Sequence, residues 1–364
     1  MAGGSLVASL ITSFALIASI AAPGGAQPRT ADPLKRGLQL TDFPRIVKIA
    51  DNVYGYEEIR QPGFTTVSLV VVGRNGVLVA DGQGNPQATQ TMLDRIRTVT
   101  TLPVRWYVVG SDHGDHTAGN SVLSPDVTYI VHPTSRAQLV RDSAAAATAN
   151  ARAAADAAGR GSAAPAPRVV VVPRSAMTGD EQTVDVGGIT VRVRFLGRAH
   201  TGGDLMVQLP QERILFMSEA YLNRVFPAMR SAYPSEWVRT VDRALALDVS
   251  RYVPGHGFIE EPAASREELV TFRKALVDVI AEVKRLHGLG ISADDAIKQA
   301  NWGEYKDWFL AEQQAPVAVR KVYEEIEGKL TPPPSAPDAK GDRKLDELPH
   351  RATPGTGRTE PHPM

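Results

Sequence analysis

Short apolar segments recur along the chain between polar turns, and in one of them Val191, Val193 and Phe195 alternate with polar residues, which is typical of β-strands. Strands are predicted at residues 65–72, 77–80, 105–109, 128–131, 191–195, 205–209 and 213–216. Asn75-Gly76 lies between the first two strands and is a typical two-residue hairpin turn. A helix is predicted at about residues 87–98, after the second strand. Hairpins with interspersed helices predict an α/β sandwich.

The C-terminal third is predicted to be helical. Ser265-x-x-Glu268 has the form of a capping box, so a helix is expected to begin there. Apolar residues follow it at helical spacing, and Ser292 is expected to begin a second helix. We therefore divide the folded part of the chain into a main domain at residues 45–260 and a C-terminal helical extension at residues 261–330.

Both ends of the chain depart from this pattern. Residues 6–22 are apolar and are followed by small residues, which predicts a signal peptide over residues 1–26. The protein is then expected to be exported, either to the periplasm or as a secreted protein, with no membrane span after cleavage; an uncleaved anchor is the alternative. Residues 331–364 are rich in Pro, Gly and charge, which predicts a disordered tail.

An Ala-rich segment at about residues 144–167 interrupts the strand pattern. It contains a run of Ala followed by Arg-Gly-Arg-Gly, which predicts a helix followed by a flexible link. We expect this segment to be an insertion that lies over one face of the main domain.

The composition limits the chemistry that the chain can perform. Among its 364 residues, 40 Lys+Arg balance 40 Asp+Glu, so no excess of positive charge favours nucleic-acid binding. The chain has no Cys, which excludes thiolate zinc sites, disulfides and iron–sulfur clusters. Any metal ion must therefore be held by His and carboxylate side chains, and the expected partner is a small-molecule substrate. The oligomeric state is left open.

Four of the eight His lie where predicted strands end in loops. His113 and His116 lie in Ser-Asp-His-Gly-Asp-His, His200 lies in Gly-Arg-Ala-His-Thr-Gly-Gly-Asp, and His256 lies in Val-Pro-Gly-His-Gly. Three or four imidazoles with one or two carboxylates are a ligand set suited to zinc, with manganese or iron as competitors. The sequence therefore predicts a metal centre with one or two ions.

These motifs resemble, in order and spacing, those of the metallo-β-lactamase fold superfamily, in the branch that includes glyoxalase II and many exported proteins. The superfamily pattern is His-x-His-x-Asp-His, a His in a Gly-x-x-His-Thr-x-Gly-Asp context, an acidic residue after a Leu-Phe strand, and Pro-Gly-His-Gly. The likeness covers roughly residues 45–258. It implies an αββα sandwich of two packed sheets with helices outside and the metal site at one edge.

The resemblance also assigns ligands to two metal ions. One ion would be held by three His, of which this chain keeps His113 and His200. The other would be held by Asp115, His116 and His256, and this set is intact.

Two positions depart from the superfamily pattern, and both concern the first ion. Ser111 stands where the leading His is expected, and Glu219, in Leu-Phe-Met-Ser-Glu, stands where the resemblance implies a bridging Asp. Serine is a poor zinc ligand unless it is deprotonated, so the first site loses affinity unless another group reaches the ion.

Three hypotheses follow from these departures. In the first, one ion at the intact set activates a water for hydrolysis of an ester, lactone, thioester, amide or related bond. In the second, Glu219 uses its extra methylene to replace the lost imidazole, and two ions are bound. In the third, the protein binds a metal or a ligand without turnover. For the first two, bound zinc lowers the pKa of water from ~15.7 to about 7, and Asp115 orients the nucleophile or carries its proton.

Three further residues are predicted to support the site. Asp81 ends its strand and resembles the superfamily's Asp near the metal loop, so it is expected to hold a metal ligand in place, and Ser111 is given the same supporting role. Tyr221 follows Glu219 in a cluster of aromatic and Met residues. These residues either line a substrate pocket, as we expect for Tyr221, or pack against the following helix.

Overall fold

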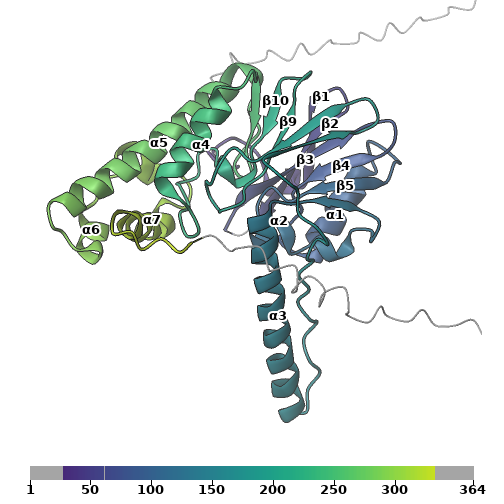
Figure 1. The fold of residues 1–364 in the computed structure, drawn as a ribbon, viewed down its shortest axis with the longest axis horizontal. Helices are drawn as coiled ribbons and strands as arrows, with labels where there is room; N and C mark the ends of the chain where they lie inside the picture. The colour runs from purple at the N-terminus through teal and green to yellow at the C-terminus, as the bar shows by residue number, and fades with distance from the viewer. Residues whose placement is uncertain (1–27, 61, 333–364) are drawn as a thin grey trace, which may run out of the picture.

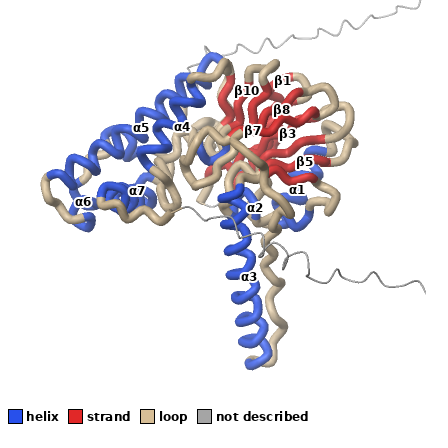
Figure 2. Tube along the Cα trace, in the orientation of Figure 1, coloured by secondary structure: helices blue, strands red, loops and turns tan. Residues whose placement is uncertain are grey.

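Two β-sheets pack face to face at the centre of the protein, with helices outside them (Figures 1 and 2). The computed structural model describes residues 28–60 and 62–332. Three apolar clusters hold its layers together: one lies between the sheets, and one lies on the outer face of each sheet, beneath the helices. This arrangement confirms the predicted α/β sandwich and its C-terminal helical extension.

The first sheet has six strands in sequence order. They are β1 (Arg45–Ala50), β2 (Val53–Arg60), β3 (Phe64–Val72), β4 (Val77–Ala80), β5 (Val104–Val108) and β6 (Thr128–Ile130). The first four strands are antiparallel, whereas β5 is parallel to both β4 and β6. The hairpin predicted at Asn75-Gly76 is confirmed, because Val72 pairs with Val77 across it.

The second sheet has five strands in the order β11-β10-β9-β8-β7. They are β7 (Glu181–Asp185), β8 (Thr190–Arg194), β9 (Met206–Leu209), β10 (Ile214–Phe216) and β11 (Arg251–Val253). Only the pair β10 and β11 is parallel.

The buried strands divide their side chains between two layers, as the two-residue period requires. In β3, Leu69 and Val71 face the other sheet, while Val70 faces outward. In β4, Leu78 lies between the sheets and Val79 packs on the outer side, in the cluster that contains Met92 of helix α1. Both strands are therefore apolar on both faces.

The helices flank this sandwich. They are α1 (Pro86–Ile96), α2 (Gly114–Thr117), α3 (Pro133–Gly159), α4 (Pro234–Leu245), α5 (Pro262–Gly288), α6 (Ala293–Gln299) and α7 (Ala311–Ile326). Short 3-10 turns lie at η1 (Leu40–Asp42), η2 (Asn120–Val122), η3 (Ser218–Ala220) and η4 (Gly303–Asp307). Helices α4, α5 and α7 pack together on the outer side of the second sheet and form the largest apolar cluster.

The capping box predicted at Ser265 and Glu268 is wrong. Helix α5 begins one turn earlier, at Pro262, whose fixed backbone angle suits the first helical position. The Ser265 hydroxyl instead accepts a hydrogen bond from Tyr252 N at 2.6 Å and donates one to Tyr252 O at 3.0 Å, which ties the helix to β11. The second helix is confirmed, because Ser292 caps α6.

The Ala-rich segment does not lie over a face of the domain. It belongs to α3, whose N-terminal end is buried in the domain while the rest projects away from the sandwich, with the following segment running back alongside it (Figure 1). Asn150 of α3 holds that returning segment through two hydrogen bonds to the backbone of Arg168, at 2.8 and 2.9 Å. The segment is therefore a hairpin-like arm.

The predicted signal peptide at residues 1–26 lies outside the described residues, as does the predicted tail beyond residue 332. None of the described helices combines the length and the apolar character that a membrane crossing requires.

Candidate metal centre

Loops from both sheets meet at one edge of the sandwich. They follow β4, β5, β8, β10 and β11 and carry, in chain order, Asp81, residues 111–116, His200, Glu219 and His256. Strands β4 and β5 are parallel, as are β10 and β11, so the carboxyl ends of each pair lie at the same edge. The sheet topology thus brings together side chains that are up to 175 positions apart in sequence, as the motifs predicted.

Each of the four histidines turns one ring nitrogen toward a common centre. His116 Nε2 lies 3.3 Å from His256 Nε2, and His200 Nε2 lies 3.1 Å from His113 Nδ1. Two facing ring nitrogens share at most one proton, so at least one lone pair of each pair points into the centre. Such convergence of imidazole lone pairs is the arrangement that a bound metal ion needs.

The outer nitrogens of three of these rings are held by the protein. His116 Nδ1 lies 3.0 Å from Asp81 Oδ2, His256 Nδ1 lies 2.8 Å from the carbonyl oxygen of Thr65, and His113 Nε2 lies 3.1 Å from the Ser231 hydroxyl. Contacts of this kind fix the ring orientation and leave the inner nitrogen for a metal ion. The outer nitrogen of His200 is buried and has no hydrogen-bond partner among the described residues.

Glu219 lies at the centre of the cluster and is buried. Its Oε1 lies 3.2 Å from His200 Nε2 and 3.3 Å from His256 Nε2. Its Oε2 lies 2.9 Å from His113 Nδ1 and accepts a hydrogen bond of 2.5 Å from the Ser111 hydroxyl. The carboxylate therefore spans the space between the two pairs of histidines, and Ser111 supports it rather than pointing at a ligand position of its own.

The possible ligand atoms form two groups that share Glu219, and the atoms of each group lie within 4.8 Å of one another. The larger group is Asp115, His116, Glu219 and His256, and the smaller group is His113, His200 and Glu219. Imidazole nitrogens and carboxylate oxygens in sets of three or four fit zinc. The residues present therefore fit the ions that the superfamily pattern implies, with Glu219 available to both.

Asp115 carries a contact that the sequence did not predict. Its Oδ2 lies 3.1 Å from His256 Nε2 and also accepts a hydrogen bond from Arg60, which ends β2. Arg60 keeps 38% of its side chain exposed and faces the same opening. Nothing in the sequence near Arg60 marks it, because its role depends on the pairing of β2 with β3.

The charges of the cluster compensate one another. Burial opposes ionisation of Glu219, but the imidazoles of His200 and His113 outweigh it and hold its pKa well below the usual range. Burial also lowers the pKa of the imidazoles, yet Glu219 raises the pKa of His113 to about 9, and Asp81 with Asp115 raises that of His116 to about 10. Without a metal ion, protonated imidazoles therefore neutralise the buried carboxylates.

Two strained residues hold the loops in place. Asp81 and Ser218 have φ angles of 63° and 49°, in the left-handed region that L residues rarely adopt. Asp81 accepts hydrogen bonds from Gly110 N at 2.7 Å and from the Ser218 hydroxyl at 2.5 Å. A Cβ on Gly110 or Gly255 would lie within 2.7 Å of Ser218, so both glycines are needed for this close approach. Asp81 thus supports His116 and also joins the loops of the two sheets.

A cavity of about 440 Å³ opens over the cluster and is lined by His113, Asp115, His200, Glu219 and His256. Its apolar wall consists of Pro62, Phe64, Leu222, Val225, Ala228, Leu310 and Val317. Its polar wall includes Arg60, Arg230, Gln313 and Gln314. Gln313, Gln314 and Val317 belong to α7, and Leu310 directly precedes it. The C-terminal extension therefore forms part of this cavity.

Tyr221 does not line that cavity, contrary to the sequence-based expectation. It is 1% exposed and its ring lies 5.7 Å from that of Phe272 in α5. Tyr221 therefore packs beneath the helices, which was the alternative hypothesis. The residue type was right for a pocket, but the direction of the chain after η3 turns the side chain into the core.

Comparison with known proteins points to one fold. The chain is 22% identical over 232 residues, 61% of its length, to the type 2 metallo-β-lactamase of Bacteroides fragilis, and the match covers 83% of that protein. It is 23% identical over 228 residues, 58% of its length, to the α subunit of 2,4-dinitroanisole O-demethylase from Nocardioides sp. (strain JS1661). Its structure matches that of the stereoselective inverting sec-alkylsulfatase Pisa1 from Pseudomonas sp. with a TM-score of 0.60, at 14% identity and over 87% of this chain. No protein-family model matches the chain.

The chain has the metallo-β-lactamase fold. The resemblance predicted from the motifs is thereby confirmed at the level of the fold. The chain spans 62% of the demethylase subunit and 56% of the alkylsulfatase, so each of those proteins has a region without a counterpart here. Within the metallo-β-lactamase fold, the cluster occupies the sheet edge at which the superfamily pattern implies a metal site.

Proposed function

We propose that this protein is a zinc-dependent hydrolase that cleaves an ester, lactone, thioester, amide or related bond of a small molecule. The observation that carries the proposal is the convergence of four inner imidazole nitrogens on the buried carboxylate of Glu219, with three of the outer nitrogens held by the protein. Burying several charged groups costs folding free energy. Their concentration beneath an open cavity therefore indicates a functional site.

We further propose that the site takes two ions that share Glu219. Its Oε1 lies close to His200 of the smaller group and to His256 of the larger one, which is a bridging position. The larger group offers four ligands and the smaller one three, so the second ion is expected to bind more weakly. Of the hypotheses drawn from the sequence, this geometry favours the one in which Glu219 compensates for Ser111.

The protein's own side chains supply orientation and charge for the reaction. A divalent ion, when bound here, supplies a Lewis acid and lowers the pKa of water toward neutrality. Asp115 is ionised, because His116 and His256 outweigh the effects of burial and of Glu219 on its pKa, and it orients the attacking water by accepting a hydrogen bond. Arg60 lies beside it at the mouth of the cavity and can donate to a developing oxyanion.

The cavity indicates which part of a substrate lies over the cluster. Its wall combines Phe64, Leu222 and Val225 with the apolar residues of α7, so it fits an apolar acyl, alkyl or ring group. The names of the similar proteins suggest three probes, namely a secondary alkyl sulfate, a β-lactam and 2,4-dinitroanisole. An aryl ester, from the proposed bond classes, is the fourth.

The test combines metal content with turnover. Protein purified without chelator is analysed for metal per chain and assayed on the four probes, before and after chelation and readdition of zinc or manganese. We expect up to two zinc ions per chain and hydrolysis that is lost on chelation and returns with the metal. His116→Ala and His256→Ala should abolish both properties, and His287→Ala, at a histidine in the helical extension, is the matched control. Metal retention without turnover on any probe would support a metal-binding protein without turnover, and no metal uptake would exclude the hydrolase and leave only a ligand-binding protein.

Export is part of the same proposal. The apolar stretch at residues 6–22 and the small residues after it support cleavage after about residue 26 and release into the periplasm or the medium. N-terminal sequencing of the protein from the periplasmic fraction and from the medium tests this, and an intact N-terminus retained in the cytoplasm would overturn it.

A further inference from the structure

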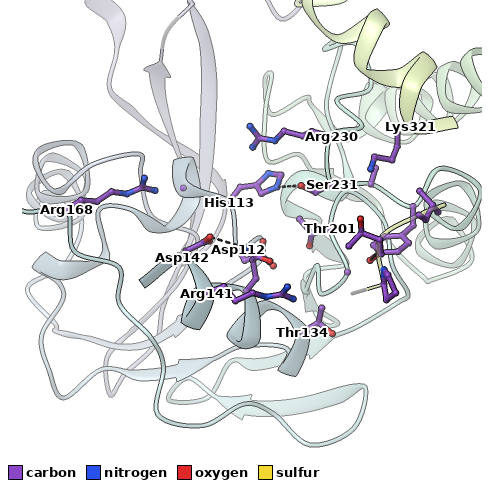
Figure 3. Close-up of a pocket in the computed structure, with 18 residues that line it drawn as sticks. Asp112, His113, Thr134, Arg141, Asp142, Arg168, Thr201, Arg230, Ser231 and Lys321 are labelled. Atoms are coloured by element: carbon purple, nitrogen blue, oxygen red, sulfur yellow. Dashed lines mark hydrogen bonds between the residues drawn. The ribbon is translucent and has the colours of Figure 1, made fainter. Parts of the chain in front are cut away.

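A second cavity, of about 480 Å³, has His113 of the candidate metal centre in its wall, and Figure 3 shows the residues that line it. It shares His113 and Arg230 with the cavity over the cluster. The Ser231 hydroxyl, which contacts His113 Nε2 at 3.1 Å, lies in its wall. The two cavities are therefore neighbours that share the side chains of His113 and Arg230.

Four cationic side chains from separate parts of the chain line this second cavity. They are Arg141 of α3, Arg168 of the segment after α3, Arg230 of the loop before α4, and Lys321 of α7. Within residues 28–60 and 62–332, the three arginines have no carboxylate within 4.0 Å, whereas Lys321 Nζ lies 2.6 Å from Glu324. Figure 3 shows these four residues distributed around His113 and Ser231.

Two carboxyl groups also line the cavity, so the cations outnumber them by four to two. Asp142 accepts a hydrogen bond from Gln138 at 3.0 Å, and Asp112 is buried beside His113. Neither carboxylate forms an ion pair with Arg141, Arg168 or Arg230 in the described structure. The guanidinium groups therefore remain available to a ligand.

The position of Arg168 is fixed by the arm. The two hydrogen bonds from Asn150 hold the Arg168 backbone against α3, the helix that also carries Arg141. The arm thus gives this part of the fold a structural role, because it brings two arginines to one cavity. Guanidinium groups bind carboxylate, sulfate and phosphate through paired hydrogen bonds.

We propose that this cavity binds an oxyanion group of the substrate, at a distance from the bond that is cleaved. The claim that the bound anion is part of a substrate rests on the proposed function. Anion binding to this cavity can be tested without turnover. The substrate would then have an apolar part over the cluster and a carboxylate, sulfate or phosphate beyond His113.

The first experiment measures anion binding to metal-free protein. Inorganic phosphate and inorganic sulfate are titrated calorimetrically into chelator-treated wild type, Arg141→Ala, Arg168→Ala and Arg152→Ala. Arg152 also lies on α3 but outside the cavity, so it is the matched control. We expect one anion per chain, with affinity reduced at least about tenfold in the first two variants and unchanged in the control. No binding to wild type, or equal binding to all four proteins, would overturn the proposal; the second result would place the anion among the protonated histidines.

The second experiment asks whether the anion belongs to the substrate. Zinc-loaded protein is assayed on 4-nitrophenyl acetate and on the 4-nitrophenyl monoester of succinic acid, which adds a carboxylate. Arg141→Ala should raise KM for the succinate ester about tenfold and leave both constants for the acetate unchanged. Equal effects on the two esters would contradict a substrate role. If zinc-loaded protein hydrolyses no probe at all, the proposed function fails while the calorimetric result stands.

Discussion

The Ser111 hydroxyl donates a hydrogen bond of 2.5 Å to Oε2 of Glu219, and both residues are buried. These are the two positions at which the sequence departs from the superfamily pattern, and they contact each other. A short side chain at position 111 leaves room for the additional methylene at position 219. We therefore propose that the two departures compensate each other, with the Glu219 carboxylate taking over from the missing imidazole.

Removing the Ser111 hydroxyl should weaken the second metal ion. In Ser111→Ala the Glu219 carboxylate loses a charge-assisted hydrogen bond, and loss of such support typically costs about 10- to 100-fold in metal affinity. We expect the first equivalent of zinc to bind as in wild type and the second to bind more weakly, as measured by competition with a chromophoric chelator. Ser121→Ala, at an exposed position, is the control. Two unchanged affinities would show that Ser111 does not support a ligand.

Exchanging both departures should be tolerated better than exchanging one. Ser111→His alone places a ring against the Glu219 carboxylate in a buried site, and overpacking of this kind typically costs about 1–3 kcal/mol. Adding Glu219→Asp removes one methylene and relieves the crowding. The double variant should therefore regain thermal stability relative to Ser111→His and bind two zinc ions at least as tightly as wild type. Additive losses in the double variant would contradict compensation between the two positions.

The sequence predicted the converging histidines because each lies in a short motif at the end of a strand. A Gly-containing loop that carries His or Asp can be recognised from a few neighbouring residues, without knowledge of the rest of the fold. His113, His116, His200 and His256 could therefore all be identified. Their convergence followed from the topology implied by the resemblance. The same reasoning found Asp81, whose position directly after β4 is a local property.

Residues whose roles depend on packing between distant elements were not predictable. Ser265 has the spacing of a capping residue, but its hydroxyl bonds to β11, and Pro262 begins the helix instead. Arg60 meets Asp115 only because β2 and β3 pair with a fixed register. The side chain of Tyr221 points into the core because of the turn at η3. The periodicity of apolar and polar residues along a strand or helix does not predict any of these three side-chain contacts.

Metal affinity should rise with pH through the neutral range. In the metal-free protein the pKa of His113 is raised to about 9 and that of His116 to about 10, so at pH 7 an ion must displace protons from both imidazoles. Each displaced proton changes the apparent affinity by about tenfold per pH unit below those values. Calorimetry at pH 7 in buffers of different ionisation enthalpy should show proton release on zinc binding. The His113→Ala variant should release fewer protons when zinc binds. Zinc affinity that does not change with pH would contradict protonated His113 and His116 in the metal-free protein.

Glu268 should stabilise the docking of the C-terminal extension. It is 1% exposed and accepts hydrogen bonds of 2.5 and 2.8 Å from Arg224, which precedes the helices, and one of 3.0 Å from Arg29. Glu268→Gln removes one partner of a buried ion pair, which should lower the free energy of unfolding by about 3 kcal/mol at pH 7. Glu267→Gln is the matched control, because that side chain is 66% exposed and its pair with Arg29 should contribute less than about 1 kcal/mol.

The effect of Glu268 should also depend on pH in a defined direction. Burial raises its pKa, but Arg224 and Arg29 outweigh burial, so its pKa in the folded protein lies below the ordinary value of 4.5. The stabilisation is therefore fully present above about pH 4.5 and is lost as the pH falls through the lowered value. Urea denaturation of chelated wild type and Glu268→Gln at several pH values should show a difference that narrows in acid. A constant difference would mean that charge is not the cause.

Tyr221→Phe should leave catalysis unchanged and should not destabilise the protein. The hydroxyl of Tyr221 is buried, and no hydrogen-bond partner for it lies among the described residues, so its removal relieves a desolvation cost of about 1 kcal/mol. The matched control is Tyr323→Phe, because the Tyr323 hydroxyl donates to the carbonyl oxygen of Ile291 at 2.7 Å and its loss should cost about as much. Opposite shifts of the unfolding free energy in the two variants, with unchanged KM for Tyr221→Phe, are expected. A raised KM would return Tyr221 to the substrate pocket, where the sequence alone had placed it.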